Sequence, residues 1–75
     1  MIFSKRLSSR DHTRQFVIDD ADARGWEVRE EQDHLVVKQT WVHDWHRVEK
    51  AMMRFAIEAV QLQRAGWVEV RRARL

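Results

Sequence analysis

Three side chains that could bind a metal ion or move a proton lie close together in this 75-residue sequence, at His43, Asp44 and His46. Imidazole nitrogens and carboxylate oxygens are common zinc ligands, and His34 is a further candidate. A zinc site normally takes three or four ligands oriented by a second layer of hydrogen bonds, and two histidines three residues apart do not supply such a set. The simpler interpretation makes Asp44 the N-cap of a helix, with His46 in its solvated first turn. We therefore assign no metal ligand and no cofactor.

General acid–base catalysis would have to rely on the same stretch, through His46 with Asp44 or Glu49. The other usual participants are missing or badly placed: the chain has no cysteine and no tyrosine, and its serines lie within the first nine residues. Catalysis also needs a concave site that excludes water, and a chain of this length offers little concavity. We assign no catalytic residue and expect a non-enzymatic protein with no small-molecule substrate.

Charge is unevenly distributed along the chain, although the formal net charge is only +2. Residues 1–15 hold four basic residues against one acidic, residues 16–34 seven acidic against two basic, and residues 35–75 eight basic against four acidic. If the two basic ends meet in the fold, they form one surface that could neutralise the phosphates of a nucleic acid. Nucleic-acid binding by an accessory protein is therefore the alternative function. The residues expected to contact such a polyanion are Lys5, Arg6, Arg71, Arg72 and Arg74.

Composition limits the scaffold that can position these residues. With 44% hydrophobic and 35% charged residues, the chain is apolar enough to fold, and its apolar residues are too dispersed for a membrane-spanning helix. Its length and lack of cysteine predict one small domain without disulfides. The first residues, Met1 to Arg6, lack the apolar segment of a secretory signal, so we expect a cytoplasmic protein that does not enter a membrane.

The clearest predicted element is a long helix from about residue 44 to residue 65. Asp44 can cap its first turn, and Gly66 can end it by adopting the left-handed conformation that a helix stop needs. Large apolar residues follow the helical spacing of three and four, which predicts one stripe that faces a core. The members of this stripe are Trp45, Val48, Met52 and Phe55, continued by Ala59 and Leu62.

An antiparallel hairpin is predicted at about residues 26–41, ahead of this helix. Residues 26–31 alternate between apolar and polar types, residues 35–42 are rich in β-branched and aromatic types, and the stretch between them is polar. We expect one face of the hairpin to be covered by the helix. The residues predicted on that face are Trp26, Val28, Leu35, Val37 and Trp41.

The segment from residue 9 to residue 24 has two interpretations. A helix is supported by a capping pattern, Ser8 with Asp11, and by Gly25 as its stop. Its β-branched residues, and three aspartates at what would be the negative end of the helix dipole, instead favour a strand at about 14–18 followed by a polar turn.

Both interpretations predict a single small α+β domain over residues 1–75. The strand interpretation, which we favour, gives a three-stranded antiparallel sheet packed against one long C-terminal helix, and residues 1–12 could then form a loosely attached arm. The alternative is a βαββα(β) order, a ferredoxin-like two-layer sandwich. In it residues 2–7 form a strand, residues 9–24 a helix, and residues 67–71 close the sheet.

A second apolar line runs along the predicted helix, beside the core stripe, through Met53, Ile57 and Val60. The two together are wider than three short strands should cover, so something else should bury the second line. The N-terminal arm could do so within one chain, or a second copy could, because small chains gain stability from association. We predict a protein-interaction or self-association module, with a homodimer or another protein as its partner. The residues predicted at the interface are Met53, Ile57, Val60 and Trp67.

Overall fold

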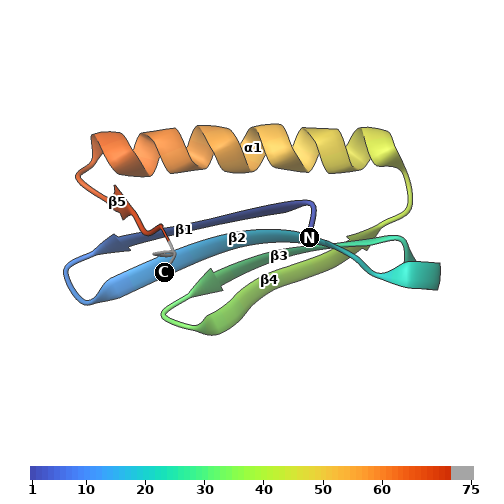
Figure 1. Ribbon diagram of the computed structural model, residues 1–75, viewed down its shortest axis with the longest axis horizontal. Coiled ribbons are helices and arrows are strands. Elements are labelled where there is room, and N and C mark those ends of the chain that lie inside the picture. The colour runs from blue at the N-terminus through green and yellow to red at the C-terminus, as the bar shows by residue number, and fades with distance from the viewer. Residues whose placement is uncertain (72–75) are drawn as a thin grey trace.

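The computed structural model describes residues 1–71 and shows an antiparallel sheet with one long helix packed on it (Figure 1). The sheet has five strands in the order β4-β3-β2-β1-β5, so neighbours in the chain are mostly neighbours in the sheet. The predicted α+β class is confirmed, but the sheet has five strands where three were expected. The elements are β1 (Phe3–Ser9), β2 (His12–Asp20), a short 3-10 turn η1 (Asp22–Arg24), β3 (Trp26–Gln32), β4 (Leu35–Val42), α1 (Trp45–Arg64) and β5 (Val68–Glu69).

Strand β1 replaces the loosely attached arm that residues 1–12 could have formed. It pairs with β2 along its whole length, from Phe3 opposite Ile18 to Ser9 opposite His12. The pairing follows from an alternation that the sequence analysis did not use: Phe3 and Leu7 point to the helix side, and Leu7 is fully buried. Residues 3–9 are therefore part of the scaffold.

Strand β2 decides between the two interpretations of residues 9–24. It runs over His12–Asp20, so the strand prediction for 14–18 was right in type but too short, and the helix of the alternative is wrong. Residues such as Val17 and Ile18, whose branched side chains suit extended backbone, are both buried there. The alternative βαββα(β) order was correct at the two ends of the chain, because β1 and β5 lie close to its first strand at residues 2–7 and its last strand at residues 67–71.

The long helix is confirmed, with α1 spanning Trp45–Arg64 inside the predicted range. The Asp44 side chain accepts a hydrogen bond of 3.0 Å from the backbone N–H of His46, as an N-cap should. At the other end Gly66, with φ +103°, closes a Schellman motif in which the N–H of Trp67 donates to the carbonyl of Leu62 at 2.9 Å. This motif turns the chain back toward the sheet, where β5 pairs with β1.

The core lies between α1 and one face of the sheet. Phe55, from the middle of the helix, has no exposed surface, and its ring centroid lies 5.0 Å from that of Phe16 and 6.0 Å from that of Phe3. The residues that make up this core are Leu7, Phe16, Ile18 and Val28 from the sheet and Val48, Ala51, Phe55 and Ala59 from the helix.

The hairpin at residues 26–41 is confirmed, but Trp41, which was predicted to face the helix, lies on the other face of the sheet. A two-residue turn pairs Gln32 with Leu35, a register that would bring Trp26 opposite Trp41. A β-bulge at Val37 adds one residue to β4, so Trp26 instead pairs with Val42 and Trp41 turns to the outer face.

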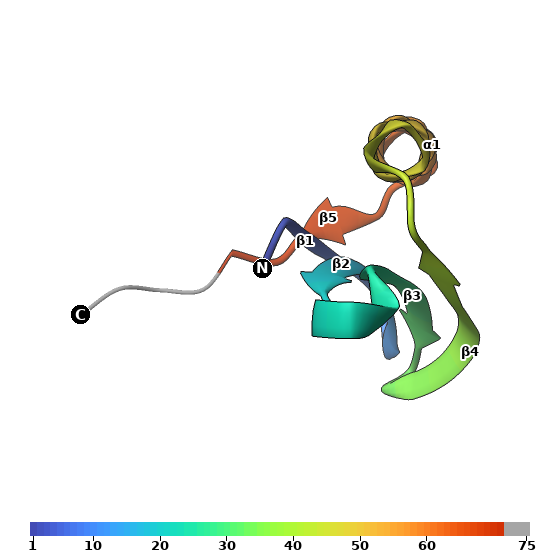
Figure 2. The ribbon, with the colours of Figure 1, turned by 90° about the vertical axis from the view of Figure 1, so that its right-hand side faces the viewer.

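The apolar residues at the tip of the hairpin are also uncovered. Leu35 is 70% exposed and Val37 53% exposed, because the tip bends away from α1 (Figure 2). On the outer face, the guanidinium of Arg24 lies 5.6 Å from the ring centroid of Trp41. Of the residues predicted to face the helix, only Trp26 and Val28 pack against the core.

The outer face of the sheet is mostly polar, and its apolar residues include Val17, which is buried opposite Arg29, and the exposed Trp41 and Val36. Arg29 donates hydrogen bonds of 2.7 Å to Glu27 and 2.8 Å to Glu31. Burial on its own lowers the pKa of Arg29, but the two carboxylates outweigh burial and raise that pKa. The outer face thus carries this charged cluster, whereas the face toward α1 carries the apolar core.

The turn between β3 and β4 connects the tips of the two hairpins. Asp33 and His34 both have positive φ, 51° and 69°, as a type I′ turn requires. The carboxylate of Asp33 accepts a hydrogen bond of 3.0 Å from the backbone N–H of Thr13 and lies 3.2 Å from Nδ1 of His12. The bond from Thr13, followed by the contact with His12, lowers the pKa of Asp33.

This lowered pKa predicts a stability difference that depends on pH. Because the pKa of Asp33 is lower in the folded chain than in the unfolded chain, its charge stabilises the fold above the ordinary pKa of about 4 and ceases to do so as the pH falls through the folded value. Asn fits the same turn conformation and keeps an acceptor for Thr13, so Asp33→Asn removes mainly the charge. In urea unfolding, we expect the variant to be slightly less stable than the parent at pH ~6, and we expect the difference to shrink as the pH falls below the ordinary carboxyl pKa of about 4. A difference that grows toward acid would contradict this account.

Candidate protein-interaction surface

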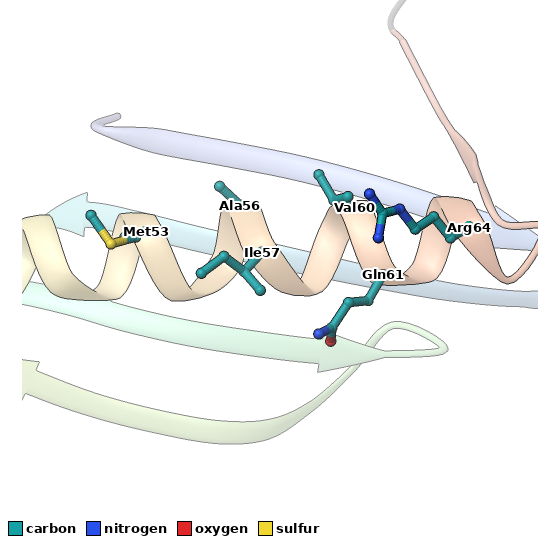
Figure 3. A pocket seen from close by; sticks show the side chains of 6 residues that line it. All are labelled: Met53, Ala56, Ile57, Val60, Gln61 and Arg64. Atoms are coloured by element: carbon teal, nitrogen blue, oxygen red, sulfur yellow. The ribbon is translucent and has the colours of Figure 1, made fainter.

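The most exposed apolar feature of α1 is the line formed by Met53, Ile57 and Val60, here called the apolar line. Their side chains are 67%, 52% and 47% exposed. Together with Ala56, Gln61 and Arg64 they border a shallow groove of about 330 Å³ along the outer side of the helix (Figure 3). The sheet therefore leaves these three side chains uncovered, as the width of the apolar stripes indicated, and their place at an interface stays a prediction.

Helical geometry explains why the sheet cannot cover this line. Val48, Phe55 and Ala59 face the sheet, and residues two positions away, such as Ile57, lie on the opposite side of the helix. The N-terminal residues do not cover the line either, because β1 lies in the sheet on the other side of α1 (Figure 1). Within residues 1–71 the apolar line thus has no covering segment.

Trp67, the fourth residue predicted at the interface, lies elsewhere. It follows Gly66 out of the helix, and its partly buried side chain packs against the core cluster. The helical spacing could not place it, because the Schellman motif redirects the chain one residue earlier. Trp67 therefore packs against the core cluster and does not lie beside the apolar line.

Two charged residues of α1 lie close to the apolar line, near its two ends. Glu49 precedes Met53 by one turn, and Arg64 follows Val60 by one turn. Both are exposed, and neither forms an ion pair within the described part of the chain. The surface therefore carries an apolar centre with opposite charges at its two ends.

The basic ends are brought together only in part. Strand β5 pairs with β1, and the N–H of Val70 donates to the carbonyl of Arg6 at 2.8 Å. Lys5, however, lies 3.9 Å from Glu69, and Arg6 donates to Gln15, so both side chains have partners within the chain. Arg71 is exposed. The other predicted polyanion contacts, Arg72 and Arg74, lie outside the described residues.

The fold separates His34 from the other histidines singled out in the sequence. His34 precedes β4 and His43 follows it, so an eight-residue strand, about 26 Å long, separates them. Asp44 is engaged as the helix cap. Over residues 1–71, no group of three or more histidine, cysteine, aspartate or glutamate side chains could hold a metal ion.

A second surface, which the sequence analysis missed, is a groove of about 210 Å³ between α1 and the edge of the sheet, here called the β4–α1 groove. The spacing of its cations on the helix was visible in the sequence, but their position beside an open strand was not. The groove is lined by Val28, Thr40 and Val42 from the sheet and by Arg47, Lys50, Ala51 and Arg54 from the helix.

Comparison with known protein families, with curated proteins and with solved structures found no match to this chain. In the part of the chain that the structure describes, no helix combines the length and the apolar character that crossing a bilayer requires. What the two surfaces can bind therefore has to be argued from their geometry and charge.

Proposed function

We propose that this protein is a non-enzymatic self-association module, in which two copies pair through the apolar lines of their α1 helices. The observation that carries the proposal is the exposure of Met53, Ile57 and Val60 along one side of a rigid helix, with no covering segment among residues 1–71. Burying apolar surface is the main driving force of association. A chain of 75 residues buries only a modest hydrophobic core by itself, so further burial at an interface would stabilise it.

Charge complementarity supports an antiparallel pair. A two-fold axis between residues 56 and 57 places Met53 of each copy opposite Val60 of the other. The same register places Glu49 of each copy opposite Arg64 of the other, so an ion pair closes each end of the interface. In a parallel pair, each charged residue would lie beside the same residue of the other copy, so like charges would meet. The arrangement is therefore self-complementary only when the helices run in opposite directions.

The proposal predicts a monomer–dimer equilibrium that depends on Ile57. In sedimentation velocity from ~10 μM to ~1 mM, the parent should shift from monomer to dimer. Ile57→Glu places two unpaired carboxylates in the interface, one from each copy, and should weaken the dimer by about tenfold or more. The control is Leu35→Glu, the same change at a more exposed apolar residue away from α1, which should dimerise like the parent.

A charge exchange tests the register independently. Glu49→Arg alone should weaken the dimer about two- to tenfold, and adding Arg64→Glu should restore it, because the exchanged pair has the same geometry. Circular dichroism would confirm that each variant keeps its helix. A parent that stays monomeric throughout, or a dimer that Leu35→Glu disrupts as strongly as Ile57→Glu does, would show the proposal to be wrong.

A further inference from the structure

The β4–α1 groove has a strongly positive rim. Arg47, Lys50 and Arg54 follow one another at helical spacing along the side of α1 that faces β4. None of the three forms an ion pair within residues 1–71. The acidic residue one turn after Arg54, Glu58, contacts Arg14 at 3.6 Å instead. The groove therefore favours a partner with negative charge.

The opposite rim of the groove is an open strand edge. Strand β4 ends the sheet order, so the backbone N–H and C=O groups that point away from β3 have no strand partner in the described chain. Every residue of β4 is exposed except Val42, which is half-buried. Past the bulge at Val37, the pairing with β3 is regular again from Lys38 to Val42, and Thr40 and Val42 line the groove.

We propose that the β4–α1 groove binds an extended acidic segment of another protein, which adds to Lys38–Val42 as a sixth strand. The unpaired backbone groups of β4 would bond to the backbone of the segment, and every second side chain of the segment would point into the groove. Acidic side chains at those positions meet Arg47, Lys50 and Arg54. The apolar floor, formed by Val28, Val42 and Ala51, accommodates their methylene groups.

A polypeptide fits this site better than a nucleic acid does. An open strand edge offers alternating donors and acceptors that match a peptide backbone, whereas single-stranded nucleic acid is held by aromatic side chains on which bases stack. The exposed tryptophan of β4, Trp41, lies on the outer face beside Arg24 and does not line the groove. The proposal does not depend on the dimer, because the apolar line is on a different side of α1.

The test uses the full chain and a fluorescein-labelled peptide of alternating glutamate and valine, about eight residues long, which is the length of β4 and within the usual range for strands. Fluorescence anisotropy should show saturable binding that weakens as salt is added. Hydrogen exchange followed by NMR should show new protection at those backbone amides of residues 38–42 that point away from β3. The same peptide with N-methylated backbone nitrogens keeps its charge but cannot add as a strand, and it should bind at least about tenfold more weakly.

Two charge-matched double variants locate the site. Arg47→Glu with Arg54→Glu should weaken binding by roughly tenfold or more, since it reverses the charge of the rim. Arg6→Glu with Arg71→Glu changes the net charge equally but lies on β1 and beyond β5, and it should change affinity less than about twofold. A single-stranded oligonucleotide of similar charge is measured in parallel.

Several outcomes would overturn the proposal. One is no binding of the peptide at ~1 mM, and another is an N-methylated peptide that binds as well as the parent peptide. A third is an equal loss in the two double variants, which would mean attraction by net charge alone. The last is an oligonucleotide that binds in place of the peptide and loses affinity when the groove is reversed, which would assign the groove to nucleic acid.

Discussion

Replacing Phe55 by alanine is expected to lower the free energy of unfolding by about 3–5 kcal/mol. The side chain has no exposed surface and sits where rings from β1 and β2 meet the middle of α1. Its removal loses the burial of a whole ring and leaves a cavity that neighbouring strands, fixed by their backbone pairing, can fill only in part. A domain of this size has a total stability of about 4–11 kcal/mol, so the variant should be close to unfolding at 25 °C.

Urea unfolding followed by circular dichroism measures this loss, and Met53→Ala is the matched control. Met53 lies on the same helix, two residues away, but is 67% exposed, so its truncation should cost less than about 1 kcal/mol. The contrast tests which side of α1 faces the sheet. If Met53→Ala proved as costly as Phe55→Ala, the packing of the helix described here would be wrong.

Replacing Gly25 by alanine is expected to cost about 3 kcal/mol or more. Gly25 has φ +89° and ψ −121°, the mirror image of an extended conformation, which an L-residue with a side chain strongly disfavours. A Cβ atom there would also lie only 2.3 Å from the carbonyl oxygen of Val42. The close contact arises because the connection from β2 to β3 passes directly against the junction between β4 and α1.

Gly66 is the matched control, since it is the other glycine of the chain and also has positive φ, +103°. A Cβ atom at Gly66 would meet nothing within 4 Å, so Gly66→Ala should cost only the backbone conformation, about 1–2 kcal/mol. Thermal unfolding of the two variants side by side measures the difference. Equal losses would mean that the close approach of Val42 to Gly25 does not exist in solution.

The two glycines also show how much of the fold can be predicted from the positions of glycine in the sequence. Both precede tryptophan, and in the alternative βαββα(β) fold they end equivalent helices. Gly66 does end α1, but Gly25 follows a single 3-10 turn and is needed for a close approach of two backbones. Glycine occurs at both places because each has a positive φ. Only the tertiary structure shows that Gly25 must also lack a side chain, because the backbone of Val42 lies against it.

The sequence by itself determined the elements whose signals are local. The spacing of Val48 and Phe55, the cap at Asp44 and the stop at Gly66 all act within a few residues, so the long helix and the exposure of its apolar line were predictable. The two strands of the hairpin were predictable for the same reason, from alternation and from a polar turn.

Tertiary structure decided the features that depend on which strands lie side by side. Pairing with β2 and β5 turned residues 3–9 from a possible arm into an inner strand, and one extra residue at Val37 turned Trp41 from the helix side to the outer face. Trp67 returned to the core, and the cations of α1 came to lie beside the open edge of β4. The physical reason is that strand register is set by contacts distant in sequence, and a shift of one residue exchanges the two faces of a strand.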